Sequence, residues 1–247
     1  YYKGKDLGDI WGLRVIGIAK NDQEMADHIA QHDQTAIGNS LWGGGDFMYA
    51  NLDDNPAITK GSETVDSHGD LTVIGNSTPR YSYGIRGTLR WKYLDFSCFF
   101  QGVGKRDVFL DSPSFFGVSG AWQRSIYKEH MDYFRYANHP LGANTDAYYA
   151  RIRTDRNNSQ CNDHYLQDAS YLRLKNVTLG YTLPQEWTKK AGLSKVRFYV
   201  AGSNLFTITG YTGYDPEVDI ATGLTPNIDN NRYPRSRTYT FGAQLTF

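Results

Sequence analysis

The sequence has few cysteines, no excess of either charge and no long apolar run. Its two cysteines, Cys98 and Cys161, lie far apart, one in a strand-like run and one in a polar loop, so a disulfide framework is excluded. Lys and Arg together number 26, as do Asp and Glu, which leaves no basic field for nucleic acid and no acidic tail. No stretch of about 18 apolar residues occurs, which excludes a transmembrane helix.

A secretion signal is missing as well. The first residues, YYKGKDLGDIW, contain no charged segment followed by an apolar core and a cleavage site. They read like the middle of a domain, so we expect the natural N-terminus to lie upstream. The length of 247 residues suits one large all-β domain or two ordinary domains.

The abundant residues favour β-structure. The chain has 19 Tyr, 12 Phe, 5 Trp and 25 Gly but only 3 Met, a mixture that suits strands, turns and aromatic surfaces. Its last ten residues, TYTFGAQLTF, alternate without interruption between apolar and polar or small side chains. This pattern predicts a strand whose two faces meet two different environments.

Two further segments alternate in ways that predict specific irregularities. Residues 81–93 alternate with period two, and the apolar parity reverses in residues 94–106, which predicts a tight hairpin around Tyr93 to Asp95. Residues 171–183 change parity internally, which predicts a β-bulge near Lys175 and Asn176.

The connections between the expected strands differ in length in a regular way. Residues 195–209 predict another strand, and residues 8–20 a less regular one. The links over about 19–79, 107–168 and 210–234 are long, whereas the hairpin turn and the link over 184–194, where we expect a helical turn, are short. Short periplasmic turns that alternate with long extracellular loops are typical of outer-membrane barrels.

This pattern predicts an all-β fold, a transmembrane antiparallel β-barrel. In such a barrel the apolar set of side chains faces lipid, and the polar set, which includes Arg86, Arg90 and Lys92, lines a wet interior. A soluble, secreted β-sandwich that binds carbohydrate through exposed aromatic residues remains the alternative, because parity alone does not separate the two. Loop lengths and the terminal Phe247 favour the barrel.

Several motifs resemble one family. SYLRLKNVTLGYTLP, VRFYVAGSNLFTITGYTGYDPEV and YPRSRTYTFGAQLTF closely resemble the C-terminal end of SusC/RagA-type TonB-dependent outer-membrane transporters. GDIWGLRVIGIAK and YSYGIRGTLRWKYLDFSCFFQGVGKRDVF resemble upstream segments of the same family. The resemblance implies that residues 1–247 form the C-terminal part of a barrel, about six of its 22 strands, without the plug domain and the first strands.

The resemblance also implies a function and partners. Such proteins import oligomeric nutrients, most often glycans and in some relatives peptides, across the outer membrane of Gram-negative bacteria. The expected partners are the TonB complex, a SusD-like surface lipoprotein that covers the barrel, and the barrel-assembly machinery. The resemblance assigns the assembly signal to the last strand, with the apolar side chains Tyr239, Phe241, Leu245 and Phe247.

The long links are rich in aromatic residues. Such side chains stack on sugars or anchor a protein partner, but they also pack loops against each other, and we give packing the greater weight. Among the functional uses, contact with the lipoprotein ranks above contact with substrate. The candidates are Trp122, Tyr127, Tyr133, Tyr136, Tyr148, Tyr149, Tyr211 and Tyr214.

No residues predict catalysis or a bound cofactor. His28 and His32 have zinc-compatible spacing on an expected short helix, but a metalloprotease would need Glu at the position of Ile29. Pro56 and Ala57 interrupt a calcium-like stretch, so we expect a solvated turn at Asp53 and Asp54. Pro216 fixes a turn between Asp215 and Glu217, which we assign to loop shape and not to glycoside cleavage.

Overall fold

The structure is a computed structural model that describes residues 4–38, 41–110, 128–155, 157–217 and 234–247. The chain divides into two compact units, which we call the sheet unit and the loop unit. The sheet unit comprises Pro79–Arg106, Asp168–Val218 and Asn231–Phe247, and the loop unit comprises Tyr1–Thr78, Asp107–Gln167 and Asp219–Asn230. Among the described residues, no helix is both long and apolar enough to cross a membrane.

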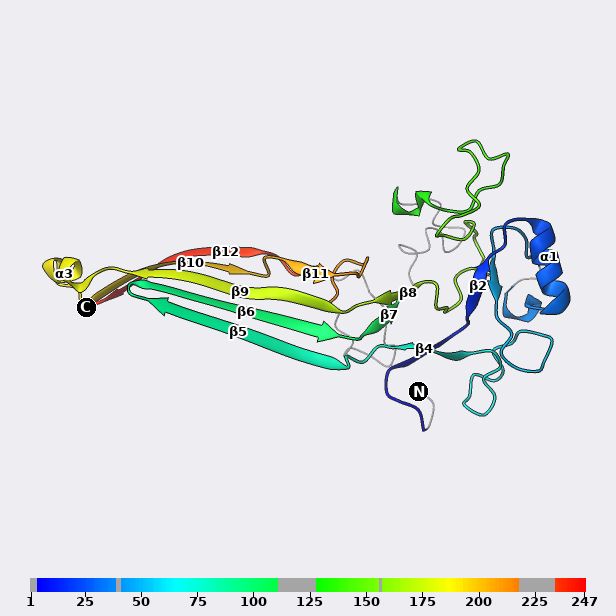
Figure 1. The fold of residues 1–247 in the computed structure, drawn as a ribbon, viewed down its shortest axis with the longest axis horizontal. Coiled ribbons are helices and arrows are strands. Elements are labelled where there is room, and N and C mark those ends of the chain that lie inside the picture. The colour runs from blue at the N-terminus through cyan, green and yellow to red at the C-terminus, as the bar shows by residue number, and fades with distance from the viewer. Residues whose placement is uncertain (1–3, 39–40, 111–127, 156, 218–233) are drawn as a thin grey trace. The chain divides into compact units, whose positions relative to one another are not determined.

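The sheet unit is built on one antiparallel sheet (Figure 1). Its strand order is β12-β10-β9-β6-β5, and a short strand, β11, continues from β10 along the same side of β9. Its strands are β5 (Tyr81–Trp91), β6 (Leu94–Gly104), β9 (Tyr171–Thr182), β10 (Lys195–Ser203), β11 (Thr207–Thr209) and β12 (Thr238–Thr246). This antiparallel sheet agrees with the all-β fold class that the sequence predicts.

The short connections lie where the sequence places them. β5 and β6 form a hairpin in which Trp91 pairs with Leu94, so the turn contains only Lys92 and Tyr93. Lys92 has a φ of 52°, and it therefore belongs to the turn, one residue earlier than expected, and not to the polar side of the strand. The link between β9 and β10 contains the expected helical turn, α3 (Gln185–Thr188), followed by η3 (Lys189–Ala191).

The predicted bulge in β9 is confirmed. Asn176 pairs with Phe99 on β6, whereas Leu174 pairs with the next residue, Phe100, so Lys175 is the extra residue. The bulge returns Leu172 and Leu174 to the same face as the apolar residues that follow it. The extra residue thus keeps the apolar side chains of β9 on one face, although their alternation in the sequence shifts by one position.

Residues 8–20 do not form one strand of the large sheet, contrary to the prediction. They form β1 (Asp9–Gly12) and β2 (Val15–Ile18), which pair with β4 (Thr72–Asn76) and β3 (Phe47–Tyr49) in separate two-stranded sheets of the loop unit. The break falls at Leu13, whose N–H donates to the carbonyl of Cys161 and which is fully buried. A long-range contact therefore divides the segment.

The rest of the loop unit consists of short elements around a small core. Helix α1 (Asp22–Gln31) is capped by Asn21, whose side chain accepts from the Glu24 N–H at 2.8 Å. The core contains Met25 of α1 with Phe47 and Tyr49 of β3, all nearly inaccessible. The remaining elements are η1 (Thr35–Ile37), η2 (Lys128–Met131), β7 (Asp107–Phe109) and β8 (Leu166–Asp168), and β7 pairs with β8.

Candidate functional site

One face of the sheet unit is apolar across all five long strands. Because residues that pair across antiparallel strands point to the same side, the register aligns the apolar positions of neighbouring strands. Many of these side chains are exposed: Phe241 is 78% exposed and Ile85 is 59% exposed. The face comprises Tyr81, Tyr83, Ile85, Leu89, Trp91, Leu94, Phe96, Cys98, Phe100, Leu172, Leu174, Val177, Leu179, Tyr181, Val196, Phe198, Val200, Tyr239, Phe241 and Leu245.

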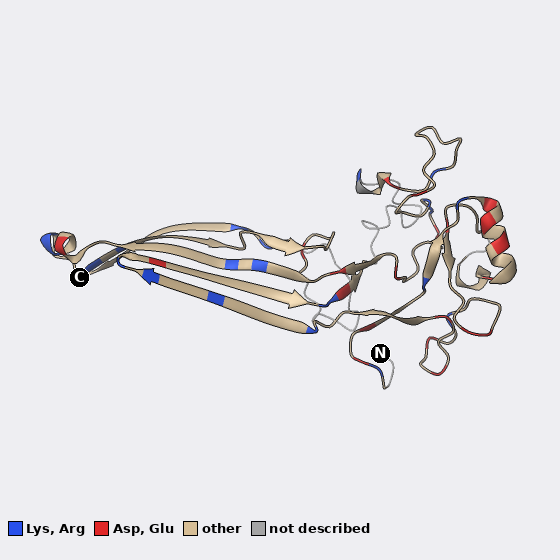
Figure 2. Cartoon of the chain, viewed as in Figure 1, with Lys and Arg blue, Asp and Glu red and all other residues tan. Residues whose placement is uncertain are grey.

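The opposite face is polar, and Figure 2 shows charged residues at only a few places along the strands. Arg86 and Arg90 both lie on this face of β5, and both are exposed. The Arg86 guanidinium lies 5.5 Å from the ring of Phe99, its cross-strand neighbour, in a cation–π contact. Threonine, serine, asparagine and glutamine occupy most of the other positions, so this face can contact water or a polar ligand.

An ion pair crosses the middle strand of the polar face. Arg197 of β10 donates to Asp95 of β6 through Nε at 2.9 Å and through Nη2 at 2.5 Å. The two side chains meet above Gly180 of β9, where any side chain would collide with both. Glycine at this position therefore lets a bidentate pair join three strands.

We expect Gly180→Val to break this pair and to lower the stability of the folded sheet by about 1–3 kcal/mol, since the valine would push both charged groups apart. The measurement is the temperature at which the folded band of the detergent-solubilised protein disappears on a gel. Gly104→Val is the matched control, because a Cβ there meets its nearest atom at 3.7 Å. Equal losses for the two variants would contradict the prediction.

A second charge cluster ties the loop after β11 to the bulge of β9. Glu217 accepts from Arg173 at 2.7 Å, from Lys175 at 2.7 Å and from Arg235 at 2.9 Å, and Asp215 accepts from Arg173 at 2.5 Å. Burial acts to raise the pKa of Asp215, but the hydrogen bonds from Arg173 and from two backbone N–H groups lower it below its ordinary value. Both carboxylates accept several hydrogen bonds, which agrees with the loop-shaping role that the sequence suggested.

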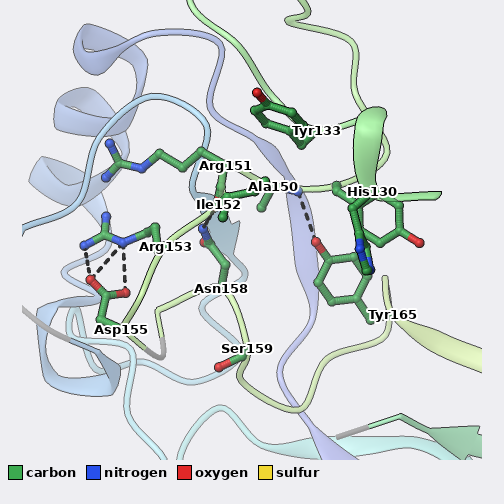
Figure 3. Close-up of a pocket in the computed structure, with 11 residues that line it drawn as sticks. His130, Tyr133, Ala150, Arg151, Ile152, Arg153, Asp155, Asn158, Ser159 and Tyr165 are labelled. Atoms are coloured by element: carbon green, nitrogen blue, oxygen red, sulfur yellow. Dashed lines mark hydrogen bonds and ion pairs between the residues drawn. The ribbon is translucent and has the colours of Figure 1, made fainter. Parts of the chain in front are cut away.

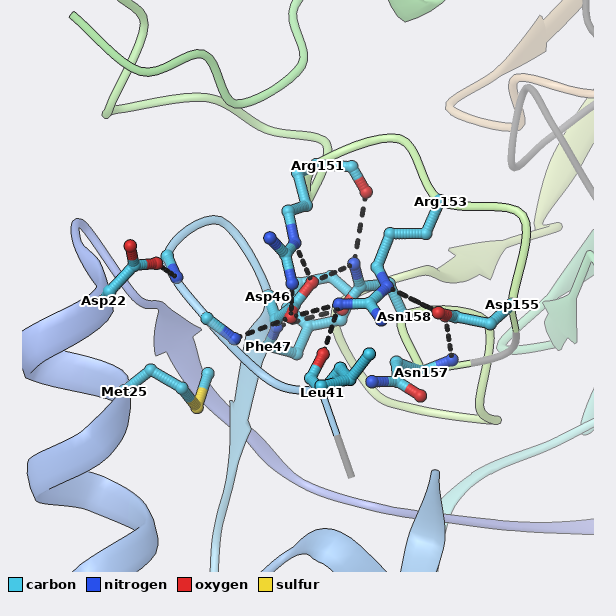
Figure 4. A network of polar contacts seen from close by, with 12 residues as sticks. Asp22, Met25, Leu41, Asp46, Phe47, Arg151, Arg153, Asp155, Asn157 and Asn158 are labelled. Carbon is cyan, nitrogen blue, oxygen red and sulfur yellow. Dashed lines mark hydrogen bonds and ion pairs between the residues drawn. The ribbon is translucent and has the colours of Figure 1, made fainter. Parts of the chain in front are cut away.

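The loop unit contains a buried carboxylate that the sequence analysis did not identify (Figure 4). Asp46 is fully buried, and it accepts two hydrogen bonds from Arg151, at 2.6 and 2.5 Å, and one from Arg153 at 2.7 Å. Asn158 Nδ2 and the Gly43 N–H donate to it as well. The only sequence signal is the run WGGGD, because three glycines before an aspartate indicate a tightly packed backbone.

The glycine run is packed between α1 and the 130s segment. Gly45 has a φ of 84°, and a Cβ there would collide with the ring of Phe134. The Gly44 N–H donates to Asp22 at 2.8 Å, and the Tyr136 hydroxyl lies within hydrogen-bond distance of two acceptors, Asp22 Oδ1 at 2.8 Å and the Gly44 carbonyl at 2.9 Å, which share its one hydrogen. These hydrogen bonds lower the pKa of Asp22 below its ordinary value. Tyr136, a predicted contact residue, therefore holds this network together.

Two of the predicted loop aromatics, Tyr148 and Tyr149, pack against each other and against neighbouring rings of the loop unit. The Tyr148 ring stacks on His164 at 4.9 Å and meets the Tyr149 ring edge-on at 4.9 Å, and Tyr149 lies 5.9 Å from the ring of Tyr165. Burial raises the pKa of Tyr148 above its ordinary value. Tyr148 remains 40% exposed, so one part of this cluster reaches solvent.

The other predicted aromatics differ in exposure. Tyr133 shares a hydrogen bond with His139 Nε2 at 3.2 Å, and Tyr211 is buried, whereas Tyr214 is 60% exposed. Trp122 and Tyr127 lie outside the described residues.

A cavity of about 30 Å³, which is about the volume of one water, lies beside Tyr149 and Tyr165 (Figure 3). It is lined by His130, Tyr133, Tyr149, Ala150, Arg151, Ile152, Arg153, Asp155, Asn158, Ser159 and Tyr165.

Two of the residues considered for metal binding, His28 and Asp53, have other partners. His28 lies on α1, as expected, and its Nε2 shares a hydrogen bond with Gln34 Oε1 at 3.1 Å. Burial lowers the pKa of His28. Asp53 accepts from the Asn55 N–H in an exposed turn. Within the part of the chain that the structure describes, no three His, Cys, Asp or Glu side chains are placed to hold a metal ion.

Comparisons with known proteins agree with the fold and the sequence motifs. No family model matches the chain. Over 99% of its length it is 31% identical to TonB-dependent receptor P3 of Formosa agariphila, and over 76% it is 28% identical to TonB-dependent receptor SusC of Bacteroides thetaiotaomicron. Among solved structures, the RagAB peptide transporter aligns with 97% of the chain at a TM-score of 0.64 and 20% identity.

The chain is much shorter than these relatives. It spans 22% of the Formosa receptor, 17% of SusC and 23% of the aligned RagAB chain. The alignments with the Formosa receptor and with the RagAB chain nevertheless extend over almost all of the chain, which includes both the sheet unit and the loop unit. The chain is therefore similar to SusC/RagA-type TonB-dependent receptors, and it spans about a fifth of the length of these relatives.

Proposed function

We propose that the sheet unit is part of the wall of an outer-membrane β-barrel that imports an oligomeric nutrient. The observation that carries this proposal is the apolar face, whose large side chains are exposed across five strands. An exposed surface of this size is costly in water and is stabilised in lipid, while the polar face, with Arg86 and Arg90, suits a wet lumen. The two exposed sheet edges, β5 and β12, call for pairing with further strands.

The remaining parts of the proposal rest on the family. Import is energised by TonB, and the barrel-assembly machinery recognises the last strand, where Tyr239, Phe241, Leu245 and Phe247 are all exposed. A SusD-like surface lipoprotein covers the loops, and the exposed Tyr148 and Tyr214 are the first aromatic residues to test for contact with it. We take a glycan as the first substrate to test and a peptide as the second. The protein carries out transport and not catalysis.

Two neighbouring residues of β6 provide a direct test. Cys98 lies on the apolar face and Ser97 on the polar face, because successive residues of a strand point to opposite sides. In full-length protein with Cys161→Ser, we expect bimane attached to Cys98 to be quenched by nitroxide-labelled lipid. Bimane attached to Ser97→Cys in a Cys98→Ser background should instead be quenched by iodide in water.

The opposite pair of results, or quenching by iodide at both positions, would exclude lipid contact at the apolar face. Protection of Cys98 from both quenchers would favour the alternative of a soluble β-sandwich, since a protein core excludes lipid and water alike. The pair of variants differs by one residue in position, so general differences in labelling and folding are controlled.

A further inference from the structure

Aromatic and basic residues gather at the end of the sheet unit where the short connections lie. The aromatic residues are Trp91 and Tyr93 at the hairpin, Tyr181 near the end of β9, and Trp187 in α3, and all four are exposed. The basic residues are Lys92, Lys189, Lys190 and Lys195, of which each is exposed. We call these eight residues the turn-end belt.

The strand register places the aromatic part of the belt beside the end of the apolar face. Trp91 pairs with Leu94, Leu94 pairs with Tyr181, and Tyr181 pairs with Phe198. The Tyr93 ring meets the Tyr181 ring edge-on at 6.3 Å, and the Thr182 N–H donates to the Tyr93 carbonyl. A bilayer that covers the apolar face therefore reaches these aromatic side chains at its boundary.

The helical turn α3 adds an aromatic anchor and positive charge to this end. Trp187 is 61% exposed, whereas its neighbour Thr188 is buried, so the turn is held through Thr188 while the indole projects outward. Lys189 and Lys190 follow directly in η3. Figure 2 shows α3 with both signs of charge at the same end as the terminus of β12.

The local charge balance is positive. The four lysines of the belt are accompanied by Glu186 in α3, and Asp95, at the start of β6, is already paired with Arg197. The ammonium of Lys92 lies 5.4 Å from the ring of Trp91, so at the hairpin a cation and an aromatic side chain are presented together. Indole and phenol rings prefer the headgroup level of a bilayer, and lysines near it attract anionic lipids.

We propose that the turn-end belt binds anionic phospholipid headgroups, with Trp91, Tyr93, Tyr181 and Trp187 at the level of the headgroups and the lysines on their phosphates. The proposal rests on the proposed function, since it requires lipid against the apolar face. In this proposal the turn-end belt prefers acidic phospholipids to uncharged ones, a preference that an amphipathic surface without the lysines would not have.

The test is the selectivity of full-length protein for spin-labelled lipids in a phosphatidylcholine bilayer at low salt. We expect the fraction of motionally restricted lipid to be about two- to fivefold higher for phosphatidylglycerol than for phosphatidylcholine. Lys189→Gln with Lys190→Gln, and separately Trp187→Ala, should each reduce this ratio. About 1 M salt should reduce it too, because the Debye length then falls to about 3 Å.

Lys5→Gln with Lys60→Gln, two basic residues of the loop unit, is the matched control and should leave the ratio unchanged. Equal restriction of the two lipids by the natural protein, or an unchanged ratio in the Lys189/Lys190 variant, would overturn the proposal while leaving the barrel in place. If neither lipid were restricted, the proposed function itself would fail, so the two failures are distinguishable.

Discussion

Replacement of Asp46 by alanine is expected to destabilise the loop unit by about 3–5 kcal/mol. The carboxylate is fully buried and is the shared acceptor of Arg151 and Arg153, whose side chains are only 26% and 12% exposed. Arg153 keeps an ion pair with Asp155, at 2.5 Å, but removal of Asp46 leaves Arg151 without its carboxylate partner in a medium of low polarity. The backbone of the glycine run also loses the acceptor of the Gly43 N–H.

Hydrogen exchange on the full-length protein in detergent provides the measurement. We expect faster exchange at the amides of Gly43, Gly45 and Phe47 in Asp46→Ala, with exchange in β9 and β10 unchanged. Asp66→Ala is the control, because Asp66 is exposed. If the amides of the loop unit were equally protected from exchange in the two variants, the buried network would contribute little to the stability of the loop unit.

A charge introduced on the apolar face of the sheet should have the second large effect. Leu179→Arg places a guanidinium between Phe96 and Val200, at a side chain that is 51% exposed on this face. If the face contacts lipid, the folded barrel should lose about 2–4 kcal/mol, the range measured for arginine near the middle of a bilayer. In water the same exposed position would tolerate arginine with little change.

Thr178→Arg is the matched control on the neighbouring residue. Thr178 lies on the polar face, between Ser97 and Ala201, so an arginine there should be tolerated in a wet lumen. Folding of full-length protein into phospholipid vesicles, followed by urea titration, measures both variants. A loss of stability in Thr178→Arg with none in Leu179→Arg would reverse the assignment of the two faces.

The long strands were predictable because their information is local. The period of two in β5, β6 and β12 and the reversal of parity at the hairpin both follow from the pleat of a strand, whatever the partner. The bulge at Lys175 was predictable for the same reason, since a change of parity within one strand needs an extra residue. A helical turn in the link before Lys195 was also correctly placed.

The candidate site was predictable only in part. Arg86 and Arg90 lie on the polar face, as the alternation requires, but Lys92 lies in the turn because its φ is positive. The proposal that loop aromatics contact a partner stays a prediction, and for Tyr148 and Tyr149 the structure adds the ring contacts that hold them within the loop unit. The sequence analysis did not foresee the three groups of paired charges described above, around Asp46, Asp95 and Glu217.

The sequence by itself determined which residues form the long strands, which of their side chains share a face, and where the chain turns, because these properties depend on neighbours two to four residues apart. Only the tertiary structure decided that residues 8–20 separate at Leu13, that Arg197 reaches Asp95 across Gly180, and that Asp46 is neutralised by Arg151. The members of the last pair lie 105 positions apart in the chain. Contacts over such distances depend on the closure of long loops and on burial, and no periodicity in the sequence reports them.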